Sequence, residues 1–396
     1  MTQTAANQTN RWPDAAERSP ITNVWGDVAL HRPTVQERLV YFAQPGSAYN
    51  HHPQITSLDG RLFATWSNGY RDEDQLGQCM LIASSDDYGR SWSAPRPLVD
   101  RQPGERTFGV VTAEGVHVHD QRLVAYYGYY DTTYQHQLMY YATGGNANLA
   151  DRNYDSYRNT HTGIVVSDDH GETWTGPMQV IHRFMPNLGP HRLASGRLIL
   201  PGNCRFPWTD DPAGIEGWIN AELPDLPEGY HDDPEGHVIA ARHWGDGRHF
   251  EEGSCFEDDQ GLVHMMMRTP HGRLAESISR DQGRTWSHPR ATDYTDCGSR
   301  MQFGRLPDGR WFGLTCPQRR SPRTPLILAA SRDGVRFDQH YVIGEADNHL
   351  ARIPGVHKFG RYGYPSCHLL EGTLHVIYSI NKEDIVVTSV DLEQLA

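Results

Sequence analysis

Four short, nearly identical turns constrain the fold of this chain more than any other feature of its sequence. The first copy has Ser85, Asp87, Gly89 and Trp92 in the pattern S-x-D-x-G-x-x-W. The pattern recurs in Ser167–Trp174 and Ser279–Trp286, and in shortened form in Ser331–Phe337. Because the copies keep their spacing, they indicate an array of equivalent supersecondary units.

The residue types explain how such a turn is stabilised. The Asp carboxylate can accept hydrogen bonds from backbone N–H groups about two residues further on, and the Gly supplies a positive φ. The aromatic residue folds back as an apolar plug. Each copy is therefore predicted to join two strands, and the fold is predicted to be all-β.

A second repeat interleaves with these turns. It consists of a turn followed by a basic or small residue and a β-rich apolar run, at residues 37–41, 60–64, 121–125, 196–200, 260–264, 309–313 and 372–376. Each instance is interpreted as the hairpin between the first two strands of a blade. The first two begin only 23 residues apart, which is too short for a four-stranded blade of roughly 50 residues.

The N-terminal segment is therefore expected to complete the last blade with residues 385–392, which would close the ring and leave no open sheet edge. The prediction is a single-domain β-propeller of six or seven four-stranded blades, with seven favoured. The propeller spans residues 21–396 and follows a loosely attached polar tail at residues 1–20. Residues 143–160 and 206–233 are interpreted as long loop insertions, which are usually functional.

Composition agrees with this fold and limits the partners. The 38 Gly, 25 Pro, 10 Trp and 19 Tyr suit short strands joined by tight turns. A net charge of −13 argues against nucleic acid and against a membrane surface as partners, although a local basic pocket could still hold an anionic sugar. No apolar run approaches the ~20 residues of a spanning helix.

Cysteine usage and the N-terminus bear on localisation. The six cysteines show no zinc-ligand spacing and no disulfide framework, so buried free thiols are expected. The first 20 residues have no basic region followed by an apolar one, so no secretion signal is predicted and a cytoplasmic protein is expected.

The four turns resemble the Asp-box of the sialidase-like (BNR repeat) β-propellers, and the resemblance covers nearly the whole chain. In that family the box is a structural brace remote from the active site. The resemblance therefore implies a fold more strongly than a reaction, and no Asp-box residue is a candidate site residue.

In a propeller, residues near the start of each blade's first strand share one central pocket. The candidate residues at such positions are Asn50, His51, His52, Asn187, His191, Arg192, Glu252, Ser299, Arg300, Gln302, Tyr364 and His368, and Arg268 and Lys358 could reach the same space. Each also has a structural explanation as a hydrogen-bonded or capping residue.

Sialidases use an arginine triad, an acidic Asp and a Tyr–Glu nucleophile pair. Glu252-Gly253-Ser254 followed by Arg268 resembles the family's glutamate segment and second arginine, and Tyr364-Pro365-Ser366 resembles its tyrosine segment. However, His51-His52-Pro53 stands where the first arginine is expected, and Ser379 stands where a glutamate partner for the tyrosine is expected. A sialidase mechanism is therefore not the first choice from sequence.

A closer resemblance is to the propeller enzymes that act on rhamnose–glucuronate linkages, namely rhamnosyl-glucuronate lyases, propeller α-L-rhamnosidases and ulvan lyases. The stretches that carry it are residues 50–53, 66–78, 303–310 and 378–385. This branch uses histidine, tyrosine and arginine where sialidases use carboxylates.

These residue types suit β-elimination from a uronate. A cation must neutralise the carboxylate so that the C5 proton becomes acidic, a base must remove this proton, and an acid must protonate the departing O4. The predicted catalytic residues are His52, His191 and Tyr364. The predicted substrate-binding residues are His51, Arg192, Glu252, Arg268, Arg300, Lys358 and His368. No metal or other cofactor is required.

The predicted function is cleavage of a rhamnose-α-1,4-glucuronate linkage by elimination. Elimination is preferred because the axial set shows one carboxylate, Glu252, whereas hydrolases usually place two beside the bond. Two alternatives stay open: a glycoside hydrolase of the rhamnosidase or sialidase type, and a non-catalytic propeller that binds an anionic oligosaccharide.

Overall fold

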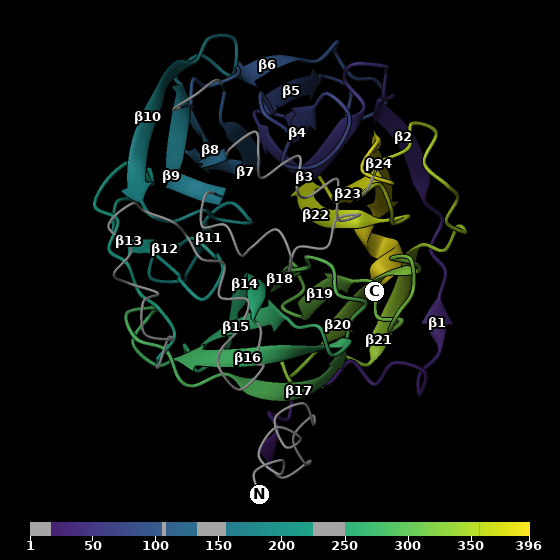
Figure 1. Ribbon diagram of the computed structural model, residues 1–396. Helices are drawn as coiled ribbons and strands as arrows, with labels where there is room; N and C mark the ends of the chain where they lie inside the picture. The colour runs from purple at the N-terminus through teal and green to yellow at the C-terminus, as the bar shows by residue number, and fades with distance from the viewer. Residues whose placement is uncertain (1–16, 105–107, 133–155, 225–249, 356) are drawn as a thin grey trace, which may run out of the picture.

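The computed structural model describes residues 17–104, 108–132, 156–224, 250–355 and 357–396. Within these ranges the strands form six sheets, arranged as blades around a central axis (Figure 1). The strands of the first two blades are β3 (Tyr49–Leu58), β4 (Arg61–Gly69), β5 (Cys79–Ser85) and β6 (Arg96–Val99), then β7 (Val110–His119), β8 (Arg122–Thr132), β9 (Ser156–Ser167) and β10 (Thr175–His182). The third and fourth blades contain β11 (His191–Arg192), β12 (Leu198–Ile199) and β13 (Trp208–Thr209), then β14 (Glu251–Glu257), β15 (Val263–Arg268), β16 (Arg273–Ser279) and β17 (Arg290–Thr295).

The last two blades include segments from both ends of the chain. They contain β18 (Gln302–Arg305), β19 (Trp311–Thr315), β20 (Leu326–Ser331) and β21 (Gln339–Gly344), edged by β1 (Leu30–His31), and β22 (Gly363–Leu370), β23 (Thr373–Ile380) and β24 (Asp384–Asp391), edged by β2 (Gln36–Tyr41). A single 3₁₀ turn, η2 (Leu392–Leu395), follows β24. The expected all-β propeller is confirmed, whereas the described strands account for six sheets rather than the favoured seven.

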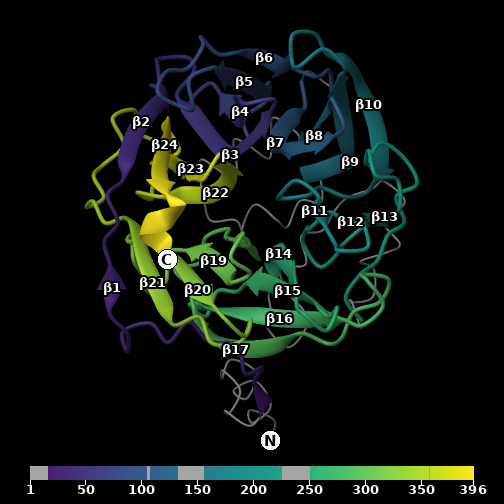
Figure 2. The same ribbon diagram turned by 180° about the vertical axis from the view of Figure 1, so that it is seen from behind.

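The ring closes as the sequence predicted. Strand β2 pairs antiparallel with β24, with Gln36 opposite Ser389 and Arg38 opposite Val387. The other six instances of the hairpin repeat form the turns between the first and second strands of the six blades. The first strand of each blade, from β3 round to β22, lies nearest the axis, as the views from both sides show (Figures 1 and 2).

The Asp-boxes join the third and fourth strands of four blades. In the first copy Ser85 Oγ donates to Asp87 Oδ1 at 2.8 Å and accepts from the Gly89 N–H at 2.8 Å. Asp87 Oδ1 also accepts from the Ser91 N–H at 2.8 Å. The carboxylate of this copy thus binds an amide four residues on, whereas in the fourth copy Asp333 Oδ1 accepts from the Val335 N–H, two residues on, as expected. The Ser91 hydroxyl donates to Asp87 Oδ2 at 2.6 Å. This hydrogen bond, followed by the others to Asp87, lowers the pKa of Asp87 to about 2.

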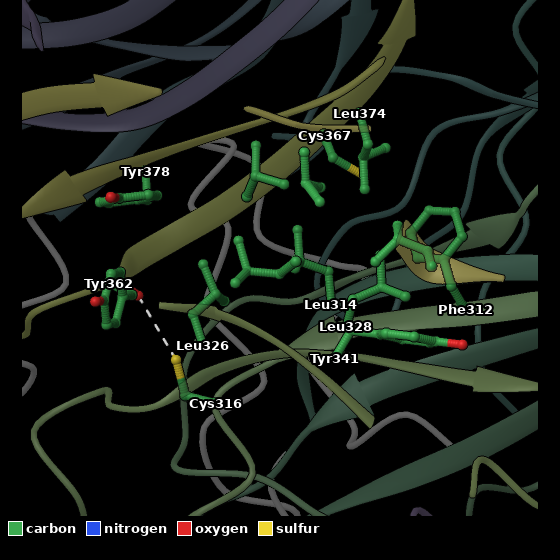
Figure 3. Packing of buried hydrophobic residues seen from close by; sticks show 14 of the residues in the cluster. Phe312, Leu314, Cys316, Leu326, Leu328, Tyr341, Tyr362, Cys367, Leu374 and Tyr378 are labelled. Carbon is green, nitrogen blue, oxygen red and sulfur yellow. Dashed lines mark hydrogen bonds between the residues drawn. The ribbon is translucent and has the colours of Figure 1, made fainter. Parts of the chain in front are cut away.

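The core lies between neighbouring blades. Strand β20 is buried at all six positions, because each face of its sheet packs on an adjacent blade, and this explains its uninterrupted apolar sequence. Figure 3 shows one such layer, in which Leu314, Leu328 and Tyr341 of the fifth blade lie opposite Leu374 and Tyr378 of the sixth.

The N-terminal segment packs on the fourth and fifth blades. Ser19 is buried and its N–H donates to Ala291 O at 2.8 Å, and Ile21 joins the apolar core. The packed part of the chain therefore begins before the predicted boundary at residue 21. Residues 1–16 lie outside the described residues, as do 143–155 and 225–233 of the predicted insertions.

The six cysteines are free thiols, as the sequence predicted. Cys297 is only partly buried, and the others are buried. Among the described residues, no helix has the length and apolar character that crossing a membrane would require.

Candidate active site

The beginnings of the inner strands converge on a cavity of about 260 Å³ at one end of the axis. Its lining comes from several blades and from the loops that follow their strands. The charged and titratable residues among those that line it are His52, Glu73, Asp74, Glu114, Tyr130, Glu251, Glu252, Arg268, Arg323, His357, Tyr364 and Lys382.

Three of these side chains are aimed at the cavity by the same backbone device. His52, Glu252 and Tyr364 have φ values of 55°, 49° and 51°, in the left-handed region that residues with a Cβ seldom occupy. In each case the pairing of the inner strand with its neighbour shifts register at this point. A bulge re-aims a side chain, and a left-handed residue costs of order 1–3 kcal/mol, so these conformations mark a functional site.

Tyr364, Glu252 and Arg268 form a hydrogen-bonded cluster. The Tyr364 hydroxyl donates to Glu252 Oε1, and Arg268 Nη1 donates to Glu252 Oε2 at 2.7 Å. Arg268 Nη1 also lies 3.3 Å from Tyr364 Oη. Burial, followed by the charge of Glu252, raises the pKa of Tyr364 well above its ordinary value. The phenol is therefore protonated at neutral pH, and Glu252 is placed to take its proton.

His51 and His52 lie on one side of Tyr364. The ring of His51 is 4.1 Å from that of Tyr364 between centroids, and its Nδ1 is 2.7 Å from Ser379 Oγ. His52 Nδ1 is 2.9 Å from Ser67 Oγ, which already accepts the Ala113 N–H. When Ser67 Oγ donates to Nδ1, the ring proton of His52 is on Nε2.

Burial lowers the pKa of His52 to about 3, against the opposing effect of Glu73, and the nearby cations Arg300, Lys382 and Arg323 lower it further. His52 is therefore neutral at physiological pH. With the proton on Nε2, it is a hydrogen-bond donor toward the cavity rather than a ready base.

Lys382 and Glu73 form a buried ion pair in the cavity wall. Burial alone would raise the pKa of Glu73, but Lys382 and the histidines nearby lower it to about 2. His51, His52 and Glu73 each offer a ligand atom within 4.8 Å of the others, an arrangement that could hold a metal ion. However, Lys382 already supplies a cation to this carboxylate, and the Tyr49 hydroxyl donates to its other oxygen at 3.2 Å.

Glu114 is the protonated carboxyl of the cavity. It lies on β7, is almost fully buried, and forms no ion pair with any of the residues that the structure describes. Burial raises the pKa of Glu114 to about 8, against a smaller opposing effect of the Thr112 hydroxyl. At neutral pH this group can donate a proton to a substrate.

Arg323 supplies a further cation from the loop between β19 and β20. It is 5% exposed, and its guanidinium lies 5.2 Å from the Tyr364 ring centroid and 5.1 Å from that of Phe359. Its Nη1 is buried without a hydrogen-bond partner among the described residues. In the cavity wall beside Tyr364, Arg268 and Lys382 are paired with Glu252 and Glu73, whereas Arg323 forms no ion pair among the described residues.

The predicted placement of six site residues at this cavity is corrected by the structure. One of them, His51, is fully buried beside Ser379 and is not part of the lining. His191 and His368 line a separate cavity of about 210 Å³ further along the axis, because each stands about four residues beyond the active end of its segment. Arg192 is exposed. Lys358 is buried against Ala48 O and Glu383.

Arg300 is fully buried and does not line the cavity. Its guanidinium donates to three backbone carbonyl oxygens, those of Asn187 at 2.7 Å, Tyr364 at 2.9 Å and Pro53 at 3.2 Å. These carbonyls belong to three different blade segments, so Arg300 connects the inner ends of the blades rather than binding a ligand.

Sequence reasoning also missed several functional candidates. Glu73, Asp74, Glu114 and Glu251 join Glu252 in the lining, so the premise that the axial set has one carboxylate is wrong. The missing glutamate partner of the tyrosine is Glu252 itself, not a residue near 379. The arginine-rich run at residues 319–323 was the signal that could have indicated Arg323.

Comparison with solved structures agrees with the fold. An unknown-function protein from Dyadobacter fermentans has a TM-score of 0.62 at 14% identity, over 91% of this chain and 99% of that chain. The Ruminococcus gnavus intramolecular trans-sialidase, in complex with oseltamivir carboxylate, has a TM-score of 0.60 at 13% identity, over 90% of this chain and 97% of that chain. The Trypanosoma rangeli sialidase, in complex with sialic acid, has a TM-score of 0.59 at 14% identity, over 93% of this chain and 60% of that chain.

These likenesses show the propeller fold, while the rhamnose–glucuronate branch stays a prediction. No curated protein matches the chain. The model of the BNR repeat-like domain matches residues 60–376, which include all four Asp-boxes and the inner strands that carry Glu252 and Tyr364. On this match over most of its length, the chain belongs to the BNR repeat-like domain family.

Proposed function

We propose that this protein is a glycosidase that releases a terminal acidic sugar, with Tyr364 as the nucleophile and Glu252 as its base. The observation that carries the proposal is the hydrogen bond from the Tyr364 hydroxyl to Glu252, with Arg268 bound to the same carboxylate. The Trypanosoma rangeli sialidase has been described as a covalent intermediate with 2,3-difluorosialic acid, which supports a covalent route on this fold.

The choice of a tyrosine follows from electrostatics. A sugar that carries a carboxylate beside its reacting carbon would repel an anionic Asp or Glu nucleophile, because like charges a few ångströms apart interact unfavourably in a buried site. A protonated phenol approaches without that repulsion. It becomes nucleophilic only as Glu252 removes its proton in the transition state.

Residues that line the cavity can supply and accept every proton that the glycosidase reaction moves. Tyr364 Oη forms a bond to the anomeric carbon while its proton passes to Glu252, and the bond from that carbon to the leaving oxygen breaks. Glu114, protonated at neutral pH, gives its proton to the leaving oxygen. Water then forms a bond to the anomeric carbon while the bond from that carbon to Tyr364 Oη breaks. Glu252 returns its proton to Tyr364 Oη, and Glu114 accepts the proton of the water.

The cations give the site its substrate class. Arg268, Arg323 and Lys382 line the same cavity as Tyr364, and a buried cation holds a carboxylate far more strongly than it holds a neutral hydroxyl. We therefore assign the acidic group of the terminal sugar to this wall.

A second candidate is elimination from a rhamnose-α-1,4-glucuronate linkage. It is favoured by the same cations, which would acidify C5 of a uronate, by Glu252, whose carboxylate could take the C5 proton, and by Glu114, whose protonated carboxyl could give its proton to the departing O4. Without turnover of any acidic glycan, a sugar-binding propeller would be the better description.

One assay separates these functions. The protein is incubated with a sialyl oligosaccharide and with a rhamnose-capped glucuronate oligosaccharide, and the released sugars and the near-ultraviolet absorbance of an unsaturated uronate are followed. Released acidic sugar without an absorbance rise supports the glycosidase, and a fluorinated acidic glycoside should then add its mass to the peptide that contains Tyr364. An absorbance rise, or turnover by Tyr364→Phe at the wild-type rate, would overturn it.

A further inference from the structure

A second cavity opens beside the active site. It has a volume of about 540 Å³, and it shares Glu251, Arg268, Arg323 and Phe359 with the active-site cavity. A ligand bound at Tyr364 could therefore extend into it without crossing any strand of a blade.

This second cavity is strongly basic, although the whole chain carries a net charge of −13. Four arginines are among the described residues that line it, namely Arg268, Arg319, Arg320 and Arg323, against the single carboxylate of Glu251. Glu251 lies 3.9 Å from Arg268 Nη1 and thus forms an ion pair with an arginine of the active site. The other three guanidinium groups form no ion pair within the part of the chain that the structure describes.

Two of these arginines have side chains that could bind a ligand. Arg323 is 5% exposed, and its buried Nη1 has no hydrogen-bond acceptor in the described residues, which is costly unless a ligand supplies one. Arg319 Nη2 donates to His271 O at 3.0 Å, and its stem packs so closely on Gly272 that an added Cβ would lie 2.7 Å from Nε. Arg319 is thus held at the wall of the cavity, and the adjacent Arg320 adds a second exposed charge.

We propose that this cavity is a subsite for a second anionic group, a carboxylate or a sulfate ester, on the sugar next to the one that is cleaved. This proposal rests on the proposed function for the orientation of the substrate, but its charge preference can be measured by binding alone. It implies that the protein prefers polyanionic glycans to chains with one acidic sugar.

The test compares ligands that differ by one charge. A disaccharide of glucuronate and N-acetylglucosamine, the same disaccharide with a 6-sulfate, and a diglucuronate are titrated by calorimetry into the full chain at low ionic strength. We expect the two doubly charged ligands to bind at least tenfold more tightly than the singly charged one, with the advantage shrinking as added salt screens the charges. Comparison of the affinities of the sulfated disaccharide and the diglucuronate shows whether the subsite prefers a sulfate ester or a carboxylate.

The variant Arg319→Ala/Arg320→Ala should lose that advantage while binding the singly charged disaccharide as the wild type does. The matched control is Arg332→Ala/Arg336→Ala, which removes the same charge from the exposed fourth Asp-box. This control should still bind the doubly charged ligands more tightly than the singly charged one. Equal affinity for all three ligands in the wild type, or an equal loss in the control, would refute the subsite. If no acidic glycan is turned over but the charge preference is present and lost only in Arg319→Ala/Arg320→Ala, the proposed function fails and the subsite stands.

Discussion

Tyr364 and Glu252 share one proton, and this predicts that their contributions to catalysis are not independent. Glu252→Gln keeps the shape of the side chain but removes the base, and should lower kcat/KM by about 10²–10⁴-fold. Tyr364→Phe removes the nucleophilic oxygen and should lose at least as much. Because the two act as a unit, the double variant should be no slower than the worse single variant. Kinetics of the three variants test this, and losses that multiply would show that the pair does not work together.

Glu114 predicts a pH dependence of both stability and activity. Its carboxyl has a pKa raised by burial to about 8 in the folded protein, against an ordinary value of 4.5. The folded state therefore holds a proton that the unfolded state releases between these values, and the contribution of Glu114 to stability, full below pH 4.5, falls as the pH rises to about 8. The slope is at most about 1.4 kcal/mol per pH unit.

Glu114→Gln should therefore flatten the dependence of Tm on pH between about 5 and 8. If Glu114 is the acid, the same variant should also remove the fall in kcat that the wild type shows as the pH rises through about 8. The second readout separates the roles. A buried carboxyl with no catalytic role would change the Tm profile and leave the shape of the rate profile unaltered.

At the scale of elements, the Asp-box glycines are predicted to matter because they face a neighbouring blade. Gly171 has a φ of 83°, and an added Cβ would lie 2.5 Å from the Phe63 ring on β4. Gly60 has almost the same φ, 82°, but open space around its Cα. Alanine at Gly60 should cost about 1–2 kcal/mol for the left-handed backbone alone. Gly171→Ala should cost about 1–3 kcal/mol more, because the blades must move apart.

Denaturant unfolding of both variants measures that difference. Equal destabilisation by Gly171→Ala and Gly60→Ala would mean that a Cβ at residue 171 does not displace Phe63 of the neighbouring blade. A pure packing effect should be relieved by shortening Phe63, so Gly171→Ala should be less harmful in a Phe63→Leu background than in the wild type.

The bulges of the inner strands explain why the site was predicted only in part. The hairpin repeat placed the start of each inner strand near the axis, which identified His52, Glu252 and Tyr364 as cavity residues. Side chains alternate along a strand, however, and a single inserted residue reverses which of them point to the axis. Sequence spacing could not show these insertions, so His51 and His52 were treated as equivalent, and Glu114, two residues beyond Thr112 on β7, was missed. Residues contributed by loops, such as Arg323, follow no strand period at all.

Across the whole molecule, the repeats sufficed for the fold because they are local signals that recur once per blade. Ring closure was predictable for the same reason, since an N-terminal strand too close to the next repeat must pair elsewhere, and it pairs with β24. The position of a residue along the axis was not predictable. Tyr364 and His368 lie on one strand, yet four residues at about 3.3 Å each separate the two cavities that they line.

Arg300 gives the last prediction, because it distinguishes a ligand-binding arginine from one that holds the ring together. If it bound substrate, Arg300→Met would raise KM and leave stability unchanged. Its donors instead serve the carbonyls of Pro53, Asn187 and Tyr364, and each buried carbonyl left without a donor costs about 1–3 kcal/mol. Arg300→Met should therefore lower Tm strongly and also reduce kcat, since the backbone of the nucleophile is one of its three anchors. Arg192→Ala is the control, an exposed arginine that should change Tm little. An Arg300→Met protein with wild-type Tm and a raised KM would restore the substrate-binding role.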